Sequence, residues 1–174
     1  LFMFLVKFAT IHLVKISAVI IAGNEEKNIA RAVKSVSWAD EILVVDSESI
    51  DRTREIAEEL GARVIISAWK GFSRQKQFAV ESAEFDWIFS LDADEEATEA
   101  LSAEIRNLVD KDNMADGYKI PRLSFYLGRP VKHGGWYPDW QLRFFNRQKG
   151  RWKDVSVHES VEVKGRIDKL REDI

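Results

Sequence analysis

The stretch Ile16-Ser-Ala-Val-Ile-Ile-Ala-Gly-Asn-Glu-Glu26 decides the fold that we expect for this chain. Its first seven residues are apolar or small and rich in β-branched side chains, which is typical of a strand buried on both faces. Polar residues end the run abruptly, and residues 28–36 follow with the apolar spacing of an amphipathic helix. Open α/β sheets are built from such strand–turn–helix units.

The same unit recurs along the first two thirds of the chain. Further strands are expected over residues 41–45, 63–66 and 87–91, and helices over residues 52–60, 73–83 and 98–109. Gly61 is expected to end the second helix and Thr98 to cap the fourth. Two more strands, at 116–121 and 141–146, flank a Gly- and aromatic-rich loop at 125–140. The pattern predicts an α/β fold: one domain with a mostly parallel sheet and flanking helices.

The composition of the chain limits the classes of protein to which it can belong. With 174 residues, 45% apolar and 32% charged, the chain suits one globular domain with a full core. A net charge of −3 argues against nucleic acid as a partner. The absence of cysteine excludes disulfides, a thiol nucleophile and a cysteine-based zinc site.

The first residues do not fit the strand–helix pattern. The apolar run at residues 1–13 is interrupted by Lys7 and His12. It matches neither a spanning helix, which needs about 20 predominantly apolar residues, nor a signal peptide with its small-residue cleavage site. We therefore expect residues 1–14 to be an N-terminal extension, either foreign to the fold or peripheral to it. The alternatives are an extra strand and a contact with a membrane surface.

The strand expected at residues 87–91 ends in Asp92-Ala93-Asp94. In an extended backbone, side chains at i and i+2 point the same way, so the two carboxylates are expected to project together. Parallel carboxylates need a cation between them, and Mg²⁺ or Mn²⁺ prefer oxygen ligands and keep positions open for phosphates. The motif thus predicts a metal–diphosphate site. The alternative is a solvated acidic turn before a helix.

Polar residues also follow the first two expected strands. Asn24 and Glu25 come after the first strand, and Asp46 comes after the second. Ligands of open α/β sheets lie beyond the carboxyl ends of the strands. Together with Asp92 and Asp94, these side chains are expected to line a single crevice.

Three segments resemble the family 2 glycosyltransferases: residues 16–26, Trp38-Ala-Asp-Glu-Ile-Leu-Val-Val-Asp-Ser47 and Leu91-Asp-Ala-Asp-Glu95. Two others, His133-Gly-Gly-Trp-Tyr-Pro-Asp-Trp-Gln-Leu-Arg-Phe-Phe145 and Val157-His-Glu-Ser-Val-Glu-Val163, resemble the branch of bacterial lipopolysaccharide core β-1,4-glucosyltransferases.

The resemblance covers residues 15–174 and implies a GT-A (Rossmann-like) catalytic domain with a nucleotide-sugar donor and a divalent metal, Mg²⁺ or Mn²⁺. It implies inverting transfer of a sugar, expected to be glucose carried by UDP. The implied acceptor is a saccharide or glycolipid of the cell envelope, and the implied location is the cytoplasm or the inner face of its membrane. Because family members continue past residue 174, the resemblance also implies a domain truncated at its C-terminal end.

The resemblance also assigns roles in donor binding. Asp94 is expected to bind the metal directly, and Asp92 to meet the metal, its bound water or the ribose. Asp46 is expected to accept a hydrogen bond from the nucleoside, with a helix cap as the alternative. The segment at residues 71–79 places Lys76, or as second choice Arg74, near the base or the phosphates.

Further roles fall in the last third of the chain. Asp139 matches the family's acidic catalytic motif and is expected to be the general base, with a turn aspartate as the alternative. Arg143 is expected to bind diphosphate, and Trp136 and Trp140 to stack on sugar. His158 is a candidate third metal ligand, although a histidine beside a glutamate is often structural.

Two rival functions remain open. One is a non-catalytic nucleotide-sugar-binding module of the same fold, which would tend to lose Asp92, Asp94 or Asp139. The other is a nucleotidyltransferase, which needs a Gly-rich phosphate loop where this chain has Ala22-Gly-Asn-Glu-Glu26. Glu48 and Arg52 stand where the family usually has glycine. Both substitutions surround the nucleoside pocket, so they bear on the choice of donor.

Overall fold

A computed structural model describes residues 14–111, 113–131, 135–154 and 159–174. The expected N-terminal extension, apart from its last residue, and the candidate ligand His158 lie outside these residues. Within them, no helix is long and apolar enough to cross a membrane.

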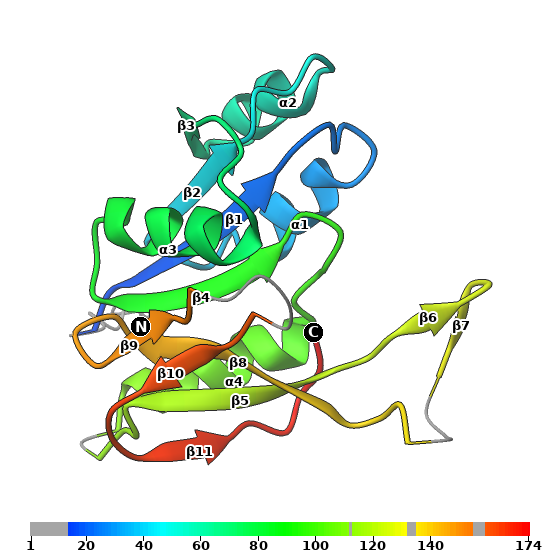
Figure 1. Cartoon of the computed structure of the whole chain (residues 1–174). Coiled ribbons are helices and arrows are strands. Elements are labelled where there is room, and N and C mark those ends of the chain that lie inside the picture. Colours follow the sequence, from blue (N-terminus) through cyan, green and yellow to red (C-terminus); the bar gives the residue numbers. More distant parts are fainter. Residues whose placement is uncertain (1–13, 112, 132–134, 155–158) are drawn as a thin grey trace, which may run out of the picture.

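A seven-stranded sheet with the order β11-β5-β8-β4-β1-β2-β3 forms the centre of the domain (Figure 1). Its strands are β1 (Ile16–Ala22), β2 (Glu41–Asp46), β3 (Arg63–Ile66), β4 (Trp87–Asp92), β5 (Gly117–Arg122), β8 (Asp139–Asn146) and β11 (Ile167–Lys169). Neighbours pair in parallel except at β8, which is antiparallel to both β4 and β5. The predicted mostly parallel sheet is therefore confirmed.

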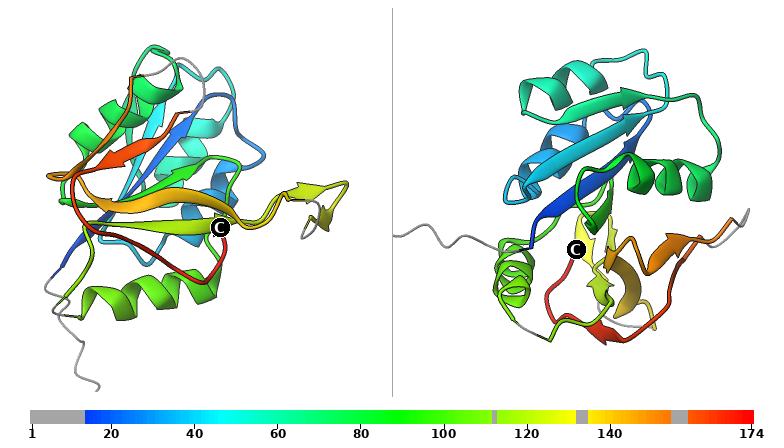
Figure 2. Two further views of the ribbon diagram at one scale, coloured as in Figure 1. Left: turned by 60° about the horizontal axis from the view of Figure 1, so that its bottom comes forward. Right: turned by 90° about the vertical axis from the view of Figure 1, so that its left-hand side faces the viewer.

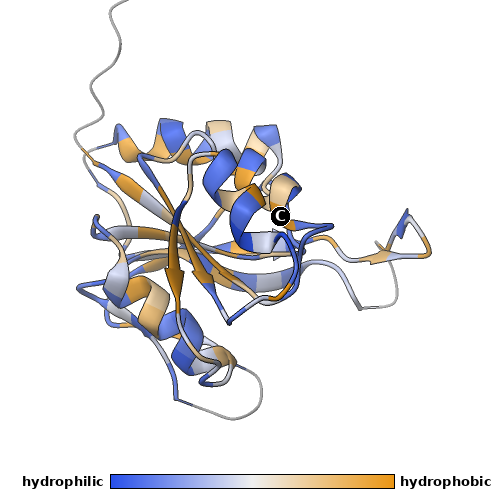
Figure 3. Cartoon of the chain, turned by 90° about the horizontal axis from the view of Figure 1, so that it is seen from above, coloured by the Kyte–Doolittle hydropathy of each residue, from blue (hydrophilic) through white to orange (hydrophobic). Residues whose placement is uncertain are grey.

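Helices cover both faces of the sheet (Figure 2). One face packs against α1 (Ile29–Ser35), α2 (Thr53–Glu59) and α4 (Glu99–Val109), and the other against α3 (Phe72–Ser82) with the hairpin of β9 (Gly150–Trp152) and β10 (Val161–Val163). Each face of the sheet has its own hydrophobic core. Strand β1 contributes to both, since Ala18 and Ile20 enter the first core and Val19 and Ile21 enter the second. Colouring by hydropathy shows apolar strands between helices whose outer faces are polar (Figure 3).

The expected helix ends at Gly61 and Thr98 are confirmed. Gly61 follows α2 with a φ of 86°, a left-handed conformation that favours glycine at a helix end. The Thr98 hydroxyl accepts a hydrogen bond from the Leu101 backbone N–H at 3.1 Å, which satisfies one of the free donors of the first turn of α4.

The expectation of one loop over residues 125–140 is wrong in two respects. It contains a short hairpin, β6 (Phe125–Tyr126) and β7 (Arg129–Pro130), and β8 begins at Asp139 rather than at residue 141. The hairpin forms because Leu127 and Gly128, with φ of 48° and 75°, make the left-handed two-residue turn that matches strand twist. Strand β8 is longer because its first two residues pair with the end of β5.

Strand β8 contains one extra residue. The consecutive residues Tyr118 and Lys119 of β5 face Phe144 and Leu142, so Arg143 is left over as a bulge. A bulge re-aims the side chain that it inserts, and here three successive residues, Arg143 to Phe145, are buried. The strand thus carries a buried cation at the one position between Asp139 and Phe145 that has no partner on β5.

The carboxylate of Glu41 joins β2 to the segment before β4. It accepts hydrogen bonds from the Ser17 hydroxyl, the Glu84 backbone N–H and the Arg63 guanidinium. Burial alone would raise the pKa of Glu41, but these hydrogen bonds and the charge of Arg63 lower it below its usual value of 4.5. The charged form is therefore the one that the folded protein stabilises.

Glu41→Ala is expected to lower the free energy of unfolding by about 2 kcal/mol, because it leaves buried donors without an acceptor. A folded-state pKa below the unfolded one stabilises the protein at neutral pH, and this stabilisation is lost as the pH falls below about 4.5. Urea unfolding at several pH values measures both effects. In the matched variant Glu41→Gln, the acid-dependent part should be absent; an unchanged pH profile would contradict the assignment.

Candidate functional site

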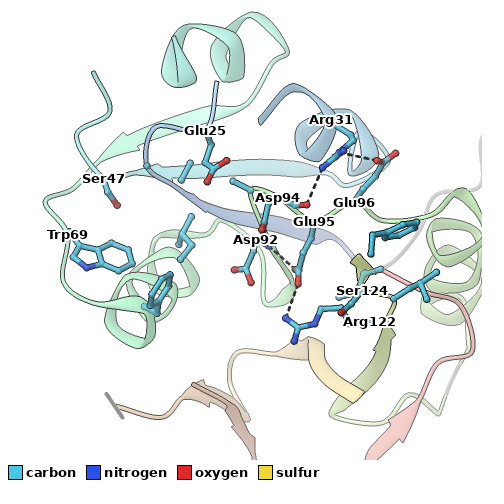
Figure 4. A pocket seen from close by; sticks show the side chains of 18 residues that line it. Glu25, Arg31, Ser47, Trp69, Asp92, Asp94, Glu95, Glu96, Arg122 and Ser124 are labelled. Atoms are coloured by element: carbon cyan, nitrogen blue, oxygen red, sulfur yellow. Dashed lines mark hydrogen bonds and ion pairs between the residues drawn. The ribbon is translucent and has the colours of Figure 1, made fainter. Parts of the chain in front are cut away.

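A cleft of about 1110 Å³ opens at the carboxyl edge of the sheet (Figure 4). Its walls come from the ends of β1 and β4, the start of α3 and the segment that follows β5. The lining residues are Ile21, Ala22, Gly23, Glu25, Arg31, Ser47, Trp69, Phe72, Asp92, Ala93, Asp94, Glu95, Glu96, Arg122, Leu123, Ser124, Phe125 and Ile174. A crevice beyond the strand ends is therefore present, and Glu25, Asp92 and Asp94 line it as expected, whereas Asn24 and Asp46 do not.

Asp92 and Asp94 both line this cleft, but not in the geometry that the sequence predicted. Strand β4 ends at Asp92, and the Glu95 backbone N–H donates to the Asp92 carbonyl at 3.0 Å, so residues 92–95 form a turn. The expectation that both carboxylates project from an extended strand is wrong, because the chain bends before Asp94. Asp94 is exposed at the turn, while Asp92 lies deeper.

Two buried cations hold the Asp92 carboxylate. Lys76 Nζ lies 2.8 Å from Oδ1 and Arg143 Nη2 lies 2.8 Å from Oδ2, although these cationic side chains are only 4% and 3% exposed. Burial raises the pKa of Asp92, but the charges of Arg143 and Lys76 outweigh it and hold the pKa well below its usual range. Lys76 is thus buried beside Asp92 and does not lie on a solvated helix face.

The ion pairs continue from Arg143 toward Asp139. Arg143 Nη2 also lies 2.8 Å from Glu95 Oε1, and Arg122 lies 3.5 Å from the same oxygen. Arg122 then donates to Asp139 Oδ2 at 2.6 Å, while Gln141 Nε2 donates to Oδ1 at 2.8 Å. Asp139 reaches the carboxyl edge because β8 runs antiparallel to β4, which brings the start of β8 beside the end of β4.

The cleft has the charge and the ligand chemistry that suit a divalent cation bound together with phosphate. Five carboxylates (Glu25, Asp92, Asp94, Glu95 and Glu96) line it with two arginines, so a diphosphate would meet net negative charge. Asp92 and Asp94 offer the hard oxygen ligands that Mg²⁺ and Mn²⁺ prefer, and such ions need only one or two carboxylates when phosphate completes the shell. No group of three metal-binding side chains occurs among the described residues.

The residues expected to bind the nucleoside lie at two depths. Asp46 is fully buried, and its carboxylate accepts hydrogen bonds from the Ser49 backbone N–H and hydroxyl. Asn24 accepts from the Ile50 backbone N–H at 3.0 Å and so joins the loops after β1 and β2. Of the three expected residues, Glu25 lines the cleft. A direct role for Asp46 stays a prediction, as do those of Asn24 and Glu25.

Three other expected contributors lie outside the cleft lining. Arg74 is 67% exposed and pairs with Asp154, with Nε and Oδ1 3.0 Å apart. Trp136 is 67% exposed. The ring of Trp140 packs beneath Lys169 Nζ, which lies 4.2 Å from the ring centroid. Their roles in donor and sugar binding stay predictions.

The cleft brings in four residues that the sequence reasoning did not assign. Glu95 and Arg122 connect Arg143, the partner of Asp92, to the candidate base Asp139. Trp69 and Phe72 line the cleft with exposed rings in an edge-to-face contact, with centroids 4.7 Å apart. Arg122 could have been found from the rule for strand ends, because it follows the apolar run of β5. The pair of aromatic residues carried no comparable signal.

Comparison with known proteins agrees with this geometry. The sequence profile named "Glycosyl transferase family 2" matches residues 17–163. An uncharacterized glycosyltransferase of Rickettsia felis is 50% identical over 65% of this chain and 40% of its own length. The lipopolysaccharide core biosynthesis glycosyltransferase LpsC of Rhizobium meliloti is 31% identical over 90% of this chain and 60% of its own length. The chain thus spans less than two thirds of the length of each relative.

Solved structures support the fold. Staphylococcus aureus TarS in complex with UDP-GlcNAc has a TM-score of 0.55 and 22% identity, over 68% of this chain and 37% of that one. Glucosyl-3-phosphoglycerate synthase of Mycobacterium tuberculosis, in complex with Mn²⁺, UDP and glucosyl-3-phosphoglycerate, has a TM-score of 0.51 and 23% identity, over 62% of this chain and 44% of that one. Because the profile matches most of its length, the chain belongs to glycosyltransferase family 2.

Proposed function

We propose that this domain transfers a sugar, glucose in our expectation, from UDP to a saccharide or lipid-linked saccharide during synthesis of cell-envelope glycan. The observation that carries the proposal is the cleft itself. It has carboxylates at and just after the end of β4, one of which, Asp92, pairs with the buried cations Lys76 and Arg143, and it adjoins Asp139 through Arg122. The printed name of LpsC supports the envelope acceptor, and the UDP complexes of structural neighbours support the nucleotide.

The diphosphate of the donor would lie at the carboxyl end of β4. Asp94, with Asp92, would hold Mg²⁺ or Mn²⁺, which would neutralise charge on the phosphates as the leaving group forms. Arg143 retains hydrogen-bonding capacity, because its Nε and Nη1 have no acceptor among the described residues. A guanidinium with free donors suits phosphate oxygens. The exposed rings of Trp69 and Phe72 would give the nucleobase or the sugar an aromatic surface.

Asp139 would act as the general base. An acceptor hydroxyl attacks the anomeric carbon from the side opposite the diphosphate; the new carbon–oxygen bond forms, the bond to phosphate breaks, and its electron pair leaves with UDP. The hydroxyl proton passes to the Asp139 carboxylate. Arg122 and Gln141 each bind one oxygen of that carboxylate. Since each carboxylate oxygen can accept more than one hydrogen bond, they orient Asp139 without blocking it.

Binding of UDP is expected to depend on metal, because the carboxylates of the cleft repel free diphosphate. Calorimetric titration of UDP with Mn²⁺ and with EDTA measures the difference, which should exceed tenfold in Kd, or about 1.4 kcal/mol. Asp94→Ala should remove the gain from Mn²⁺ while leaving the melting temperature unchanged, since Asp94 is exposed. Asp168→Ala, on an exposed carboxylate of β11, is the matched control.

Equal affinity for UDP in Mn²⁺ and EDTA would refute the metal assignment. The rival function, a non-catalytic module, predicts metal-dependent binding of UDP without any turnover. Release of UDP from UDP-glucose, with saccharide acceptors and with water alone, separates the two functions. Turnover that disappears in Asp94→Ala and persists in Asp168→Ala would support the transferase.

A further inference from the structure

The hairpin β6–β7 presents an unusual apolar surface. Phe125, Tyr126 and Leu127 are 65%, 72% and 86% exposed. Among the described residues, no other run of three consecutive large apolar side chains is exposed. Single exposed apolar residues are ordinary on protein surfaces, whereas a contiguous group indicates a site of interaction.

The hairpin extends away from the rest of the domain, as the views in Figures 1 and 3 both show. Its tip is the turn of Leu127 and Gly128, in which Leu127 has a φ of 48°. Asn, Asp and Gly are favoured in such turns because an L side chain adopts this conformation reluctantly. A leucine at this tip therefore makes the turn less stable and exposes a large apolar side chain to water, so folding alone does not explain it.

The charge of this segment differs from that of the chain. Residues 117–138 contain four Lys or Arg and no Asp or Glu, whereas the whole chain has 26 Lys or Arg and 29 Asp or Glu. Arg129 lies on the hairpin and is exposed, and it forms no ion pair within the described part of the chain. An apolar projection that carries Arg129 and no carboxylate is complementary to a surface that is negatively charged outside and apolar beneath.

We propose that the β6–β7 hairpin docks on the surface of a bilayer that contains anionic phospholipid. Phe125, Tyr126 and Leu127 enter the boundary between headgroups and acyl chains, where the ring and hydroxyl of a tyrosine suit the two environments. Arg129 faces the headgroup phosphates. Because Phe125 also lines the cleft, docking would turn the cleft mouth toward the membrane.

This last point rests on the proposed function, since it would let a lipid-linked acceptor reach the cleft. Docking itself needs neither donor nor turnover. Vesicle binding measured without a nucleotide therefore tests the hairpin alone, and its failure would leave the transfer reaction intact.

The chain contains no cysteine, so a single label can report on the hairpin. Leu127→Cys carries an environment-sensitive maleimide dye. Ile50→Cys carries the same dye as the matched control, at a residue that is 95% exposed and lies between Glu48 and Asp51 in the sequence. Vesicles of phosphatidylglycerol and phosphatidylcholine should shift the emission of the first label to the blue and leave the second unchanged. Pure phosphatidylcholine or high salt should weaken the shift.

A second measurement uses co-sedimentation with the same vesicles. The double variant Phe125→Ser/Tyr126→Ser should bind at least about tenfold more weakly than Ile50→Ser, because two apolar groups no longer enter the interface. Both variants should melt close to the unsubstituted chain, since the replaced side chains are exposed.

Three results would overturn the proposal. The first is equal shifts from the labels at residues 50 and 127 with vesicles. The second is undiminished sedimentation of the double variant, which would assign membrane binding to another segment. The third is a shift at residue 127 that grows with protein concentration and needs no vesicles, which would identify a second copy of the chain as the partner.

Discussion

Asp139→Asn is expected to lower kcat for sugar transfer by roughly 10²-fold or more, the usual scale of general-base catalysis. Asparagine keeps the size of the side chain and can still accept a hydrogen bond from Arg122, but it does not take a proton from the acceptor hydroxyl. The affinity for UDP should change little, because Asp139 is proposed to meet the acceptor hydroxyl and not the diphosphate. Initial rates of UDP release with a saccharide acceptor, beside calorimetry with UDP, separate the two effects.

Asp168→Asn is the control for this experiment, because it removes a carboxylate from β11 where no role in the reaction is proposed. Turnover of Asp139→Asn within about threefold of the unsubstituted chain would place the base elsewhere. Glu159 is then the next carboxylate to replace. Its Oε1 lies 3.5 Å from Lys76 Nζ, on the same side of the site as Asp92.

Arg143→Met is expected to lower the free energy of unfolding by about 3–5 kcal/mol. The methionine fills similar space, but Asp92 and Glu95 lose the buried cation that both of them contact. Burial lowers the pKa of Arg143, yet the charges of Glu95 and Asp92 raise it further, so the guanidinium stays charged at every pH of interest. Affinity for UDP with Mn²⁺ should fall by tenfold or more, since one phosphate-binding donor is gone.

Arg147→Met is the matched control. Arg147 follows the far end of β8, pairs with Asp86 at 3.0 Å and is 23% exposed, so its loss should reduce stability less and leave affinity for UDP intact. Adding Glu95→Gln to Arg143→Met should restore part of the lost stability, because it removes one of the unpaired charges. Two additive losses in this double variant would contradict the coupling of Arg143 with Glu95.

Sequence patterns predicted the sheet well because its strands are nearly continuous apolar runs and two helix ends are clearly marked, by Gly61 after α2 and by Thr98 before α4. The order of the buried runs and the polar residues after them were enough to expect one cleft at the strand ends. The hairpin β6–β7 was missed because two-residue strands have no period to detect, and its turn uses Leu127 instead of asparagine or glycine.

The site was only partly predictable, since its most connected contacts join residues far apart in the sequence. Lys76 comes from α3, Asp92 from β4 and Arg143 from β8, and their ion pairs span 16 and 51 residues. The assumption of an extended backbone failed at Asp94, where the chain turns. The antiparallel direction of β8, which brings Asp139 to the cleft edge, follows from sheet pairing and not from any local pattern.

The bulge at Arg143 shifts the alternation of side chains along β8 by one residue. Phe144 and Phe145 are set by the core, whereas Asp139 to Leu142 follow an alternation offset by one residue. A designer who regularised the strand by deleting Arg143 would keep the core and every pair with β5, from Asp139 with Arg122 to Leu142 with Lys119, because the bulge residue has no partner there. Loss of this one residue from β8 would therefore leave the proposed base on its present face, and would take from Asp92 and Glu95 the buried cation that pairs with both.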